Sequence, residues 1–169
     1  RSVRVVEVGK LVTDRKMLAA RVRSRIGRVV ADRIQTYDGS GDAITTSGSF
    51  GDVITPAPKG LVSTPASPVR AQRWVLSGAK TGEGVRTQIA VYNPGDKAAE
   101  VDVVFSYEDP RRYSPLAPVE LTIRPRQHTM VDVNTIPELE PEANLWVDVR
   151  SINAQPIVAE RVSSFGEPS

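Results

Sequence analysis

The chain has 169 residues, of which 40% are hydrophobic and 25% charged, so it is long enough to bury a core and too apolar to be disordered throughout. Its formal net charge is only +2, and no run of Lys or Arg exceeds two residues, so we expect no nucleic-acid partner. There is no cysteine and one histidine, His128. Disulfides and thiolate metal sites are therefore excluded, and we expect neither a metal nor a cofactor.

No apolar stretch reaches the roughly 18 residues of a membrane-spanning helix, so the sequence predicts no membrane span. Residue 1 is an arginine and no signal peptide follows it, which indicates a processed or excised part of a longer protein. A serine hydrolase would have to use His128, and the chain lacks the Gly-x-Ser-x-Gly turn of many such enzymes. We therefore expect a protein that is not an enzyme.

The aliphatic residues indicate the fold class. The chain has 24 Val and 9 Ile against 8 Leu and 2 Met, and β-branched side chains favour strands over helices. Thirteen prolines and 12 glycines divide the chain into short segments, as in an antiparallel β-sandwich. The sequence therefore predicts an all-β protein.

Residues 1–35 contain three predicted strands, at Val3–Val8, Leu18–Ser24 and Val29–Ile34. Residues 36–71 are rich in Gly, Ser, Thr and Pro, a composition that buries too little apolar area to offset chain entropy, so we expect a linker there.

Residues 72–169 are expected to form a complete seven-stranded sandwich, because apolar and polar residues alternate between clear turn sequences. The predicted strands are Arg73–Leu76, Arg86–Tyr92, Ala98–Ser106, Val119–Arg124, Thr129–Val133, Leu145–Ser151 and Pro156–Ser164. The predicted core residues are Val103, Phe105, Val131, Val133, Val147 and Val149.

The two ends of the chain resemble each other. Residues 18–24 align with residues 145–151, residues 29–34 align with residues 157–162, and residues 6–11 can be laid on residues 131–136. We interpret residues 1–35 as the last three strands of a first copy of the same domain. Three strands alone would leave an apolar face and a sheet edge uncovered. We therefore expect another part of the parent protein, or a second copy of the chain, to cover residues 1–35.

Several short motifs resemble a known family: Arg73-Trp74-Val75-Leu76, Asn93-Pro94-Gly95-Asp96, and the closing segment Gln155 to Arg161. They are similar to a repeat of secreted and cell-envelope proteins of Actinobacteria, domain-of-unknown-function family 5719, and to related immunoglobulin-like surface repeats. The resemblance covers residues 73–165, and residues 3–37 as a partial copy. It implies an immunoglobulin-like antiparallel β-sandwich in an extracellular or cell-envelope protein, and it supplies no catalytic residues.

These observations favour a structural or adhesive module. The alternative is a glycan-binding sandwich that uses exposed aromatic side chains, because such a module could bind cell-wall glycan. The candidate glycan-binding residues are Trp74, Tyr92, Tyr107 and Tyr113.

Arg33 and Arg161 occupy equivalent positions in the two copies, and each follows an acidic residue, Asp32 or Glu160. Both arginines fall on a strand face that should be apolar. We therefore expect each to form a structural ion pair or to clamp the backbone rather than to bind a ligand.

Overall fold

The computed structural model describes residues 3–12, 18–38, 44–48, 51–55, 59–109, 111 and 116–165. Nearly all of the regular structure within these residues is β-strand. The elements in chain order are α1 (Val8–Leu11), β1 (Asp32–Asp38), β2 (Ile44–Gly48), β3 (Gly51–Thr55), β4 (Lys59–Pro65), β5 (Arg73–Lys80), β6 (Val85–Tyr92), β7 (Ala99–Tyr107), β8 (Val119–Ile123), β9 (His128–Asp132), the short 3-10 helix η1 (Val133–Thr135), β10 (Asn144–Ser151) and β11 (Val158–Phe165).

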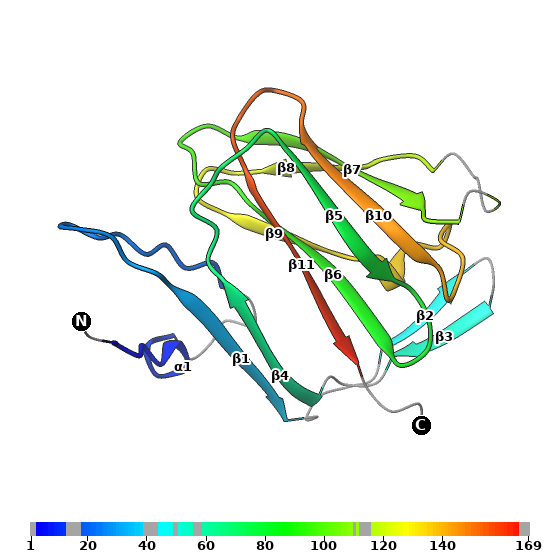
Figure 1. Cartoon of the computed structure of the whole chain (residues 1–169). Coiled ribbons are helices and arrows are strands. Elements are labelled where there is room, and N and C mark those ends of the chain that lie inside the picture. The colour runs from blue at the N-terminus through cyan, green and yellow to red at the C-terminus, as the bar shows by residue number, and fades with distance from the viewer. Residues whose placement is uncertain are drawn as a thin grey trace.

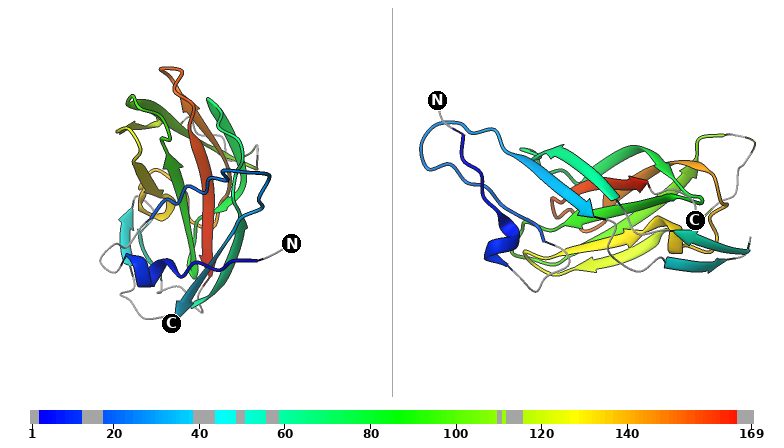
Figure 2. Two further views of the ribbon diagram at one scale, coloured as in Figure 1. Left: turned by 90° about the vertical axis from the view of Figure 1, so that its left-hand side faces the viewer. Right: turned by 90° about the horizontal axis from the view of Figure 1, so that it is seen from below.

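Strands β5 to β11 form a two-layer β-sandwich (Figures 1 and 2). One sheet has four strands in the order β5-β10-β7-β8, and the other has three in the order β11-β6-β9. Every pairing between these strands is antiparallel. All seven strands predicted for this region are present, so the predicted fold class is confirmed.

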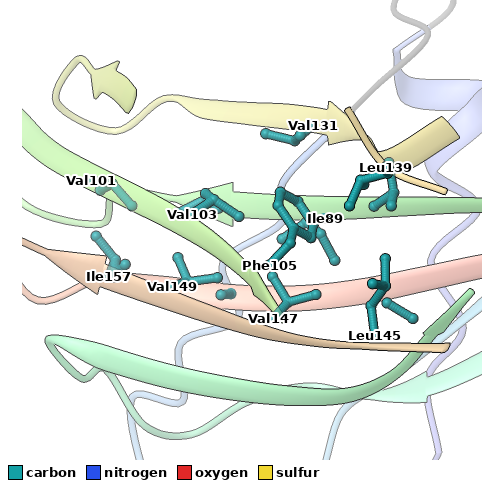
Figure 3. Packing of buried hydrophobic residues seen from close by; sticks show 14 of the residues in the cluster. Ile89, Val101, Val103, Phe105, Val131, Leu139, Leu145, Val147, Val149 and Ile157 are labelled. Carbon is teal, nitrogen blue, oxygen red and sulfur yellow. The ribbon is translucent and has the colours of Figure 1, made fainter. Parts of the chain in front are cut away.

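The core lies between the two sheets, where alternate residues of each strand point inward (Figure 3). Along β10, for example, Leu145, Val147 and Val149 have no exposed surface, whereas the residues between them face outward. The six predicted core residues are all buried. Burial of each such side chain stabilises the fold by about 1.5 to 3 kcal/mol, so this apolar layer is the main source of stability.

The turn after β6 is held by one buried amide. Asn93 has no exposed surface, and its Nδ2 atom donates hydrogen bonds to the carbonyl oxygens of Lys97 (2.7 Å) and Ile123 (2.9 Å). Its Oδ1 atom accepts a hydrogen bond from the Gly95 N–H at 2.9 Å. The side chain thereby joins the end of β6 to the end of β8 across the two layers, with its polar atoms satisfied.

Strand β5 is longer than predicted, because it continues past Leu76 to Lys80. A bulge lets it continue: the pairing with β10 shifts register between Leu145 and Val147, and Gly78 has a φ of 68°. A glycine adopts this left-handed conformation at little cost, and the extra residue re-aims the strand. Ala79 is therefore turned into the core and is fully buried.

Within the described residues of this chain, the N-terminal segment does not form the predicted strands by itself. The strands expected at Val3–Val8 and Leu18–Ser24 are absent from the described residues, where only the turn α1 has regular structure. The third expected strand, Val29–Ile34, is replaced by β1, which begins at Asp32. Strand formation requires a hydrogen-bonded neighbour, and residues 3–12 and 18–30 have none, since their backbone pairs with no strand of the described chain.

The linker expected over residues 36–71 is also corrected, because this stretch carries strands β2, β3 and β4 and the end of β1. Strand β1 pairs with β4, and β2 pairs with β3. Figure 1 shows the β1-β4 pair beside β11, the edge strand of the three-stranded sheet. The pair therefore covers part of an edge that would otherwise be open.

Candidate functional site

The outer face of the four-stranded sheet carries an exposed tryptophan. Strand alternation turns Trp146 away from the core, and 47% of its surface is exposed. On the neighbouring strand β5, Val75 is 57% exposed and lies opposite Asp148. A large ring and an aliphatic side chain on one flat sheet face form an amphipathic surface that suits a ligand with one apolar side.

A charged cluster lies beside this surface. The Asp148 carboxylate accepts hydrogen bonds from Arg73 Nη2 (2.8 Å) and Nε (3.0 Å), and from Arg150 Nε at 2.8 Å. Burial of Asp148 raises the pKa of its carboxyl group, but the hydrogen bonds and charges of the two arginines outweigh burial and lower the pKa to about 2. Asp148 is therefore ionised at neutral pH and holds both guanidinium groups on the sheet face.

The same face becomes acidic toward β8. Arg150 lies opposite Asp102 of β7, and Asp102 lies opposite Glu120 of β8. Two cationic and two acidic side chains thus form a row across the sheet from Arg73 to Glu120. These groups can orient a polar ligand by hydrogen bonds, while Trp146 supplies the stacking surface.

The four aromatic residues predicted as a glycan platform do not share one surface. Trp74 points inward, packs against the core and donates a hydrogen bond from Nε1 to the Ile157 carbonyl at 3.0 Å. The Tyr107 hydroxyl accepts a hydrogen bond from the Glu140 N–H at 3.0 Å. Tyr92 lies on the other sheet, in β6, and Tyr113 lies outside the described residues. The period-2 alternation around Trp146 is the sequence signal that identifies the exposed ring instead.

The two predicted arginine positions differ in their contacts. Arg33 forms an ion pair with Glu160, with Nη2 and Oε1 2.6 Å apart, and so joins β1 to β11. Arg161 makes no ion pair among the described residues; it donates from Nη1 to the Gly78 carbonyl at 2.8 Å and to the Ser163 hydroxyl at 2.7 Å. Of the two expected arrangements, Arg33 therefore forms the ion pair, and Arg161 forms the backbone clamp, which joins β11 to the bulge in β5.

The N-terminal segment presents a second surface. Large apolar side chains along residues 3–34 are exposed to an unusual degree, among them Val3 (93%), Val5 (81%), Ile26 (94%) and Val30 (92%). Figure 1 and the right-hand view of Figure 2 show the described residues of this segment running outside the two layers of the sandwich. An exposed apolar strip of this length is typical of an interaction surface.

The described residues contain no group of three or more His, Cys, Asp or Glu side chains placed to hold a metal ion. In the same part of the chain, no helix is both long and apolar enough to cross a membrane.

Comparison with known proteins gives one family and several distant structures, among them the following two. The model of the family of unknown function DUF5719 matches residues 53–159. The Anabaena sensory rhodopsin transducer is 19% identical, with a TM-score of 0.45, over 57% of this chain and 100% of that chain. The structure of Thermotoga maritima 1070 is 15% identical, with a TM-score of 0.46, over 59% of this chain and 95% of that chain. No curated protein matches the sequence.

Proposed function

This chain belongs to the family of unknown function DUF5719, and we propose that it is a non-catalytic structural or adhesive module of a secreted or cell-envelope protein. The observation that carries the proposal is the contrast between its two parts. The sandwich has a closed apolar core, whereas residues 3–34 expose a long series of valines and isoleucines. A segment of this kind is stable in an assembled protein, where another surface covers it.

The covering surface is another part of the parent protein or a second copy of the chain. Residues 18–31 offer a direct measurement, because Arg21, Arg23, Arg25 and Arg28 are all exposed there and trypsin cleaves after arginine. We expect rapid cleavage at these sites in the purified chain. In the envelope fraction of cells that produce the protein, the same sites should resist trypsin. Recovery of the protein in the cytosol, with the four sites cleaved as fast as in the purified chain, would contradict the proposal.

A second candidate function is glycan binding, and the exposed ring of Trp146 favours it. The indole lies beside Val75 and the Arg73–Asp148–Arg150 cluster, so a sugar could stack on the ring while its hydroxyl groups bond to the charged side chains. Titration with cell-wall polysaccharide should quench the fluorescence of Trp146, and Trp146→Ala should abolish binding. Asn144→Ala, an exposed position of the same strand, is the control and should bind normally. If Trp146→Ala and Asn144→Ala bind the polysaccharide equally well, this face is not the glycan-binding surface.

A further inference from the structure

We propose that residues 3–34 supply the last three strands of a second sandwich, to which a homologous partner contributes the equivalents of β5 to β8. This inference rests on the proposed structural role and specifies the partner that covers the segment. The segment would provide the equivalents of β9, η1, β10 and β11. It would thus complete both sheets of the partner.

The side-chain pattern of the segment matches that of the complete copy. Leu18, Ala20 and Val22 align with Leu145, Val147 and Val149, whose side chains have no exposed surface in the sandwich. In the N-terminal segment the same positions lack a core, since Leu18 is 43% exposed and Val22 is 62% exposed.

The second aligned stretch repeats the pattern. Val29 and Ile34 align with the buried Ile157 and Val162, yet they are 59% and 68% exposed. The segment therefore has the inward-facing residues of a sandwich without the opposite layer.

The backbone of the segment also keeps local features of the complete copy. The bend at residues 25–27 contains Gly27 with a φ of 77°, and the aligned residue between β10 and β11 is Ala154 with a φ of 61°. Likewise, the turn α1 aligns with η1. Val8 aligns with Val133, and each is the first residue of its helical turn. Features that depend on local sequence are present in both copies, and those that depend on a neighbouring strand are present in one.

Strand pairing in the sandwich supports the same partner. In the complete sandwich β10 lies between β5 and β7, and β11 and β9 flank β6. Among the described residues, the N-terminal segment has no such neighbours, because the chain's own β5, β6 and β7 are already paired with its own β9, β10 and β11. Strand β1 pairs with β4 along one edge only within the described residues, so its other edge is open to an equivalent of β6.

Charge identifies the partner more closely. Arg21 stands where the complete copy has Asp148, and Arg23 stands where it has Arg150. In a second copy of this chain Arg21 would therefore face Arg73, and a cluster of guanidinium groups would have no carboxylate between them. The partner must instead carry an acidic residue at the position equivalent to Arg73. Residues 1–35 as a whole hold 10 of the 22 basic residues but only 3 of the 20 acidic ones, which also favours an acidic partner.

The experiment joins an added copy of residues 73–127 directly to Val3 of the full chain, so that Gln127 precedes Val3 as it precedes His128 in the sandwich. Two versions are compared, one with Arg73 kept in the added copy and one with Arg73→Asp there. In the Asp version, amide hydrogen exchange over residues 18–24 should slow by at least on the order of a hundredfold relative to the unmodified chain. The Arg version should show clearly less protection.

Two adjacent alanines provide matched variants of the Asp version. Ala20 aligns with the buried Val147 and Ala19 with the exposed Trp146, although both alanines are exposed in the chain itself. Ala20→Asp should abolish the protection, and Ala19→Asp should leave it. Equal effects of the two substitutions, or no slowing in either version, would overturn the proposed strand register.

Two further outcomes overturn the identity of the partner. Equal protection in the Arg and Asp versions would remove the requirement for an acidic residue. If the unmodified chain sediments as a dimer that Ala20→Asp dissociates, the partner is a second copy. The trypsin comparison does not depend on the register, so it distinguishes failure of this inference from failure of the proposed function.

Discussion

At the scale of single residues, the charged cluster around Asp148 predicts a pH dependence of stability. The pKa of Asp148 is about 2 in the folded protein, below its ordinary value of 3.8. A lowered folded-state pKa stabilises the protein above the ordinary pKa, and this gain disappears as the pH falls from about 4 to about 2. Because both arginine side chains are at least half exposed, water and salt screen the pair. Asp148→Asn should therefore lower the free energy of unfolding at pH 7 by only about 1 kcal/mol.

Denaturant unfolding at pH 7 and at pH 2.5 measures this effect. The difference in stability between the natural protein and Asp148→Asn should shrink at the lower pH. Asp109→Asn is the control, since Asp109 pairs with Arg111, whose side chain is 89% exposed, in a surface loop. Its effect at pH 7 should be smaller. An unchanged gap between the natural protein and Asp148→Asn at both pH values would contradict the assignment.

At the scale of single elements, the inner face of β10 and the outer face of the adjacent strand β5 should differ in their contribution to stability. Val149 is fully buried, whereas Val75 on the adjacent strand is 57% exposed on the outer face. Val149→Ala should lower the free energy of unfolding by about 2 kcal/mol, because it leaves a cavity in the core. Val75→Ala should change it by less than about 0.5 kcal/mol. Thermal unfolding followed by circular dichroism measures both, and similar losses would mean that the layers are assigned wrongly.

The strands of the sandwich could be predicted because the local sequence distinguishes the inner face of each strand from its outer face. Alternation at Val147 and Val149, with Asp148 between them, identifies an inner and an outer face without knowledge of the neighbouring strands. The extension of β5 could not be predicted, since Gly78 in a bulge and glycine in a turn look the same in sequence. The strands within residues 36–71 were missed for a similar reason: a Gly- and Thr-rich segment becomes a strand only when another strand pairs with it.

The candidate site was predictable in part. Trp146 alternates with Val147 in the sequence, so its outward position follows from the same pattern that places the core. The contacts of Asp148 with Arg73 do not follow from the sequence, because these residues lie on strands that are 75 positions apart. For the same reason the ion pair between Arg33 and Glu160, 127 positions apart, required the structure.

At the scale of the whole molecule, the sandwich and the preceding residues depend on each other little. All residues of the buried core cluster lie between Ala79 and Ala159. The described links from the sandwich to earlier residues include the Arg33–Glu160 ion pair and the contact of β4 with β11. Ala71 belongs with the sandwich, since it exchanges backbone hydrogen bonds of 2.9 and 3.0 Å with Ile157.

Deletion of residues 1–70 should therefore leave a folded domain. A half-exposed ion pair contributes no more than about 1 kcal/mol, so the free energy of unfolding should fall by about that amount. The shortened protein also loses the exposed valines and isoleucines of residues 3–34, and it should be less prone to self-association at high concentration. Circular dichroism melting and sedimentation velocity measure the two effects. Deletion of residues 1–72 is the control and should be less stable, because it also removes the Ala71–Ile157 hydrogen bonds. Loss of the cooperative transition on deletion of residues 1–70 would show instead that strands β1 to β4 and the sandwich share one core.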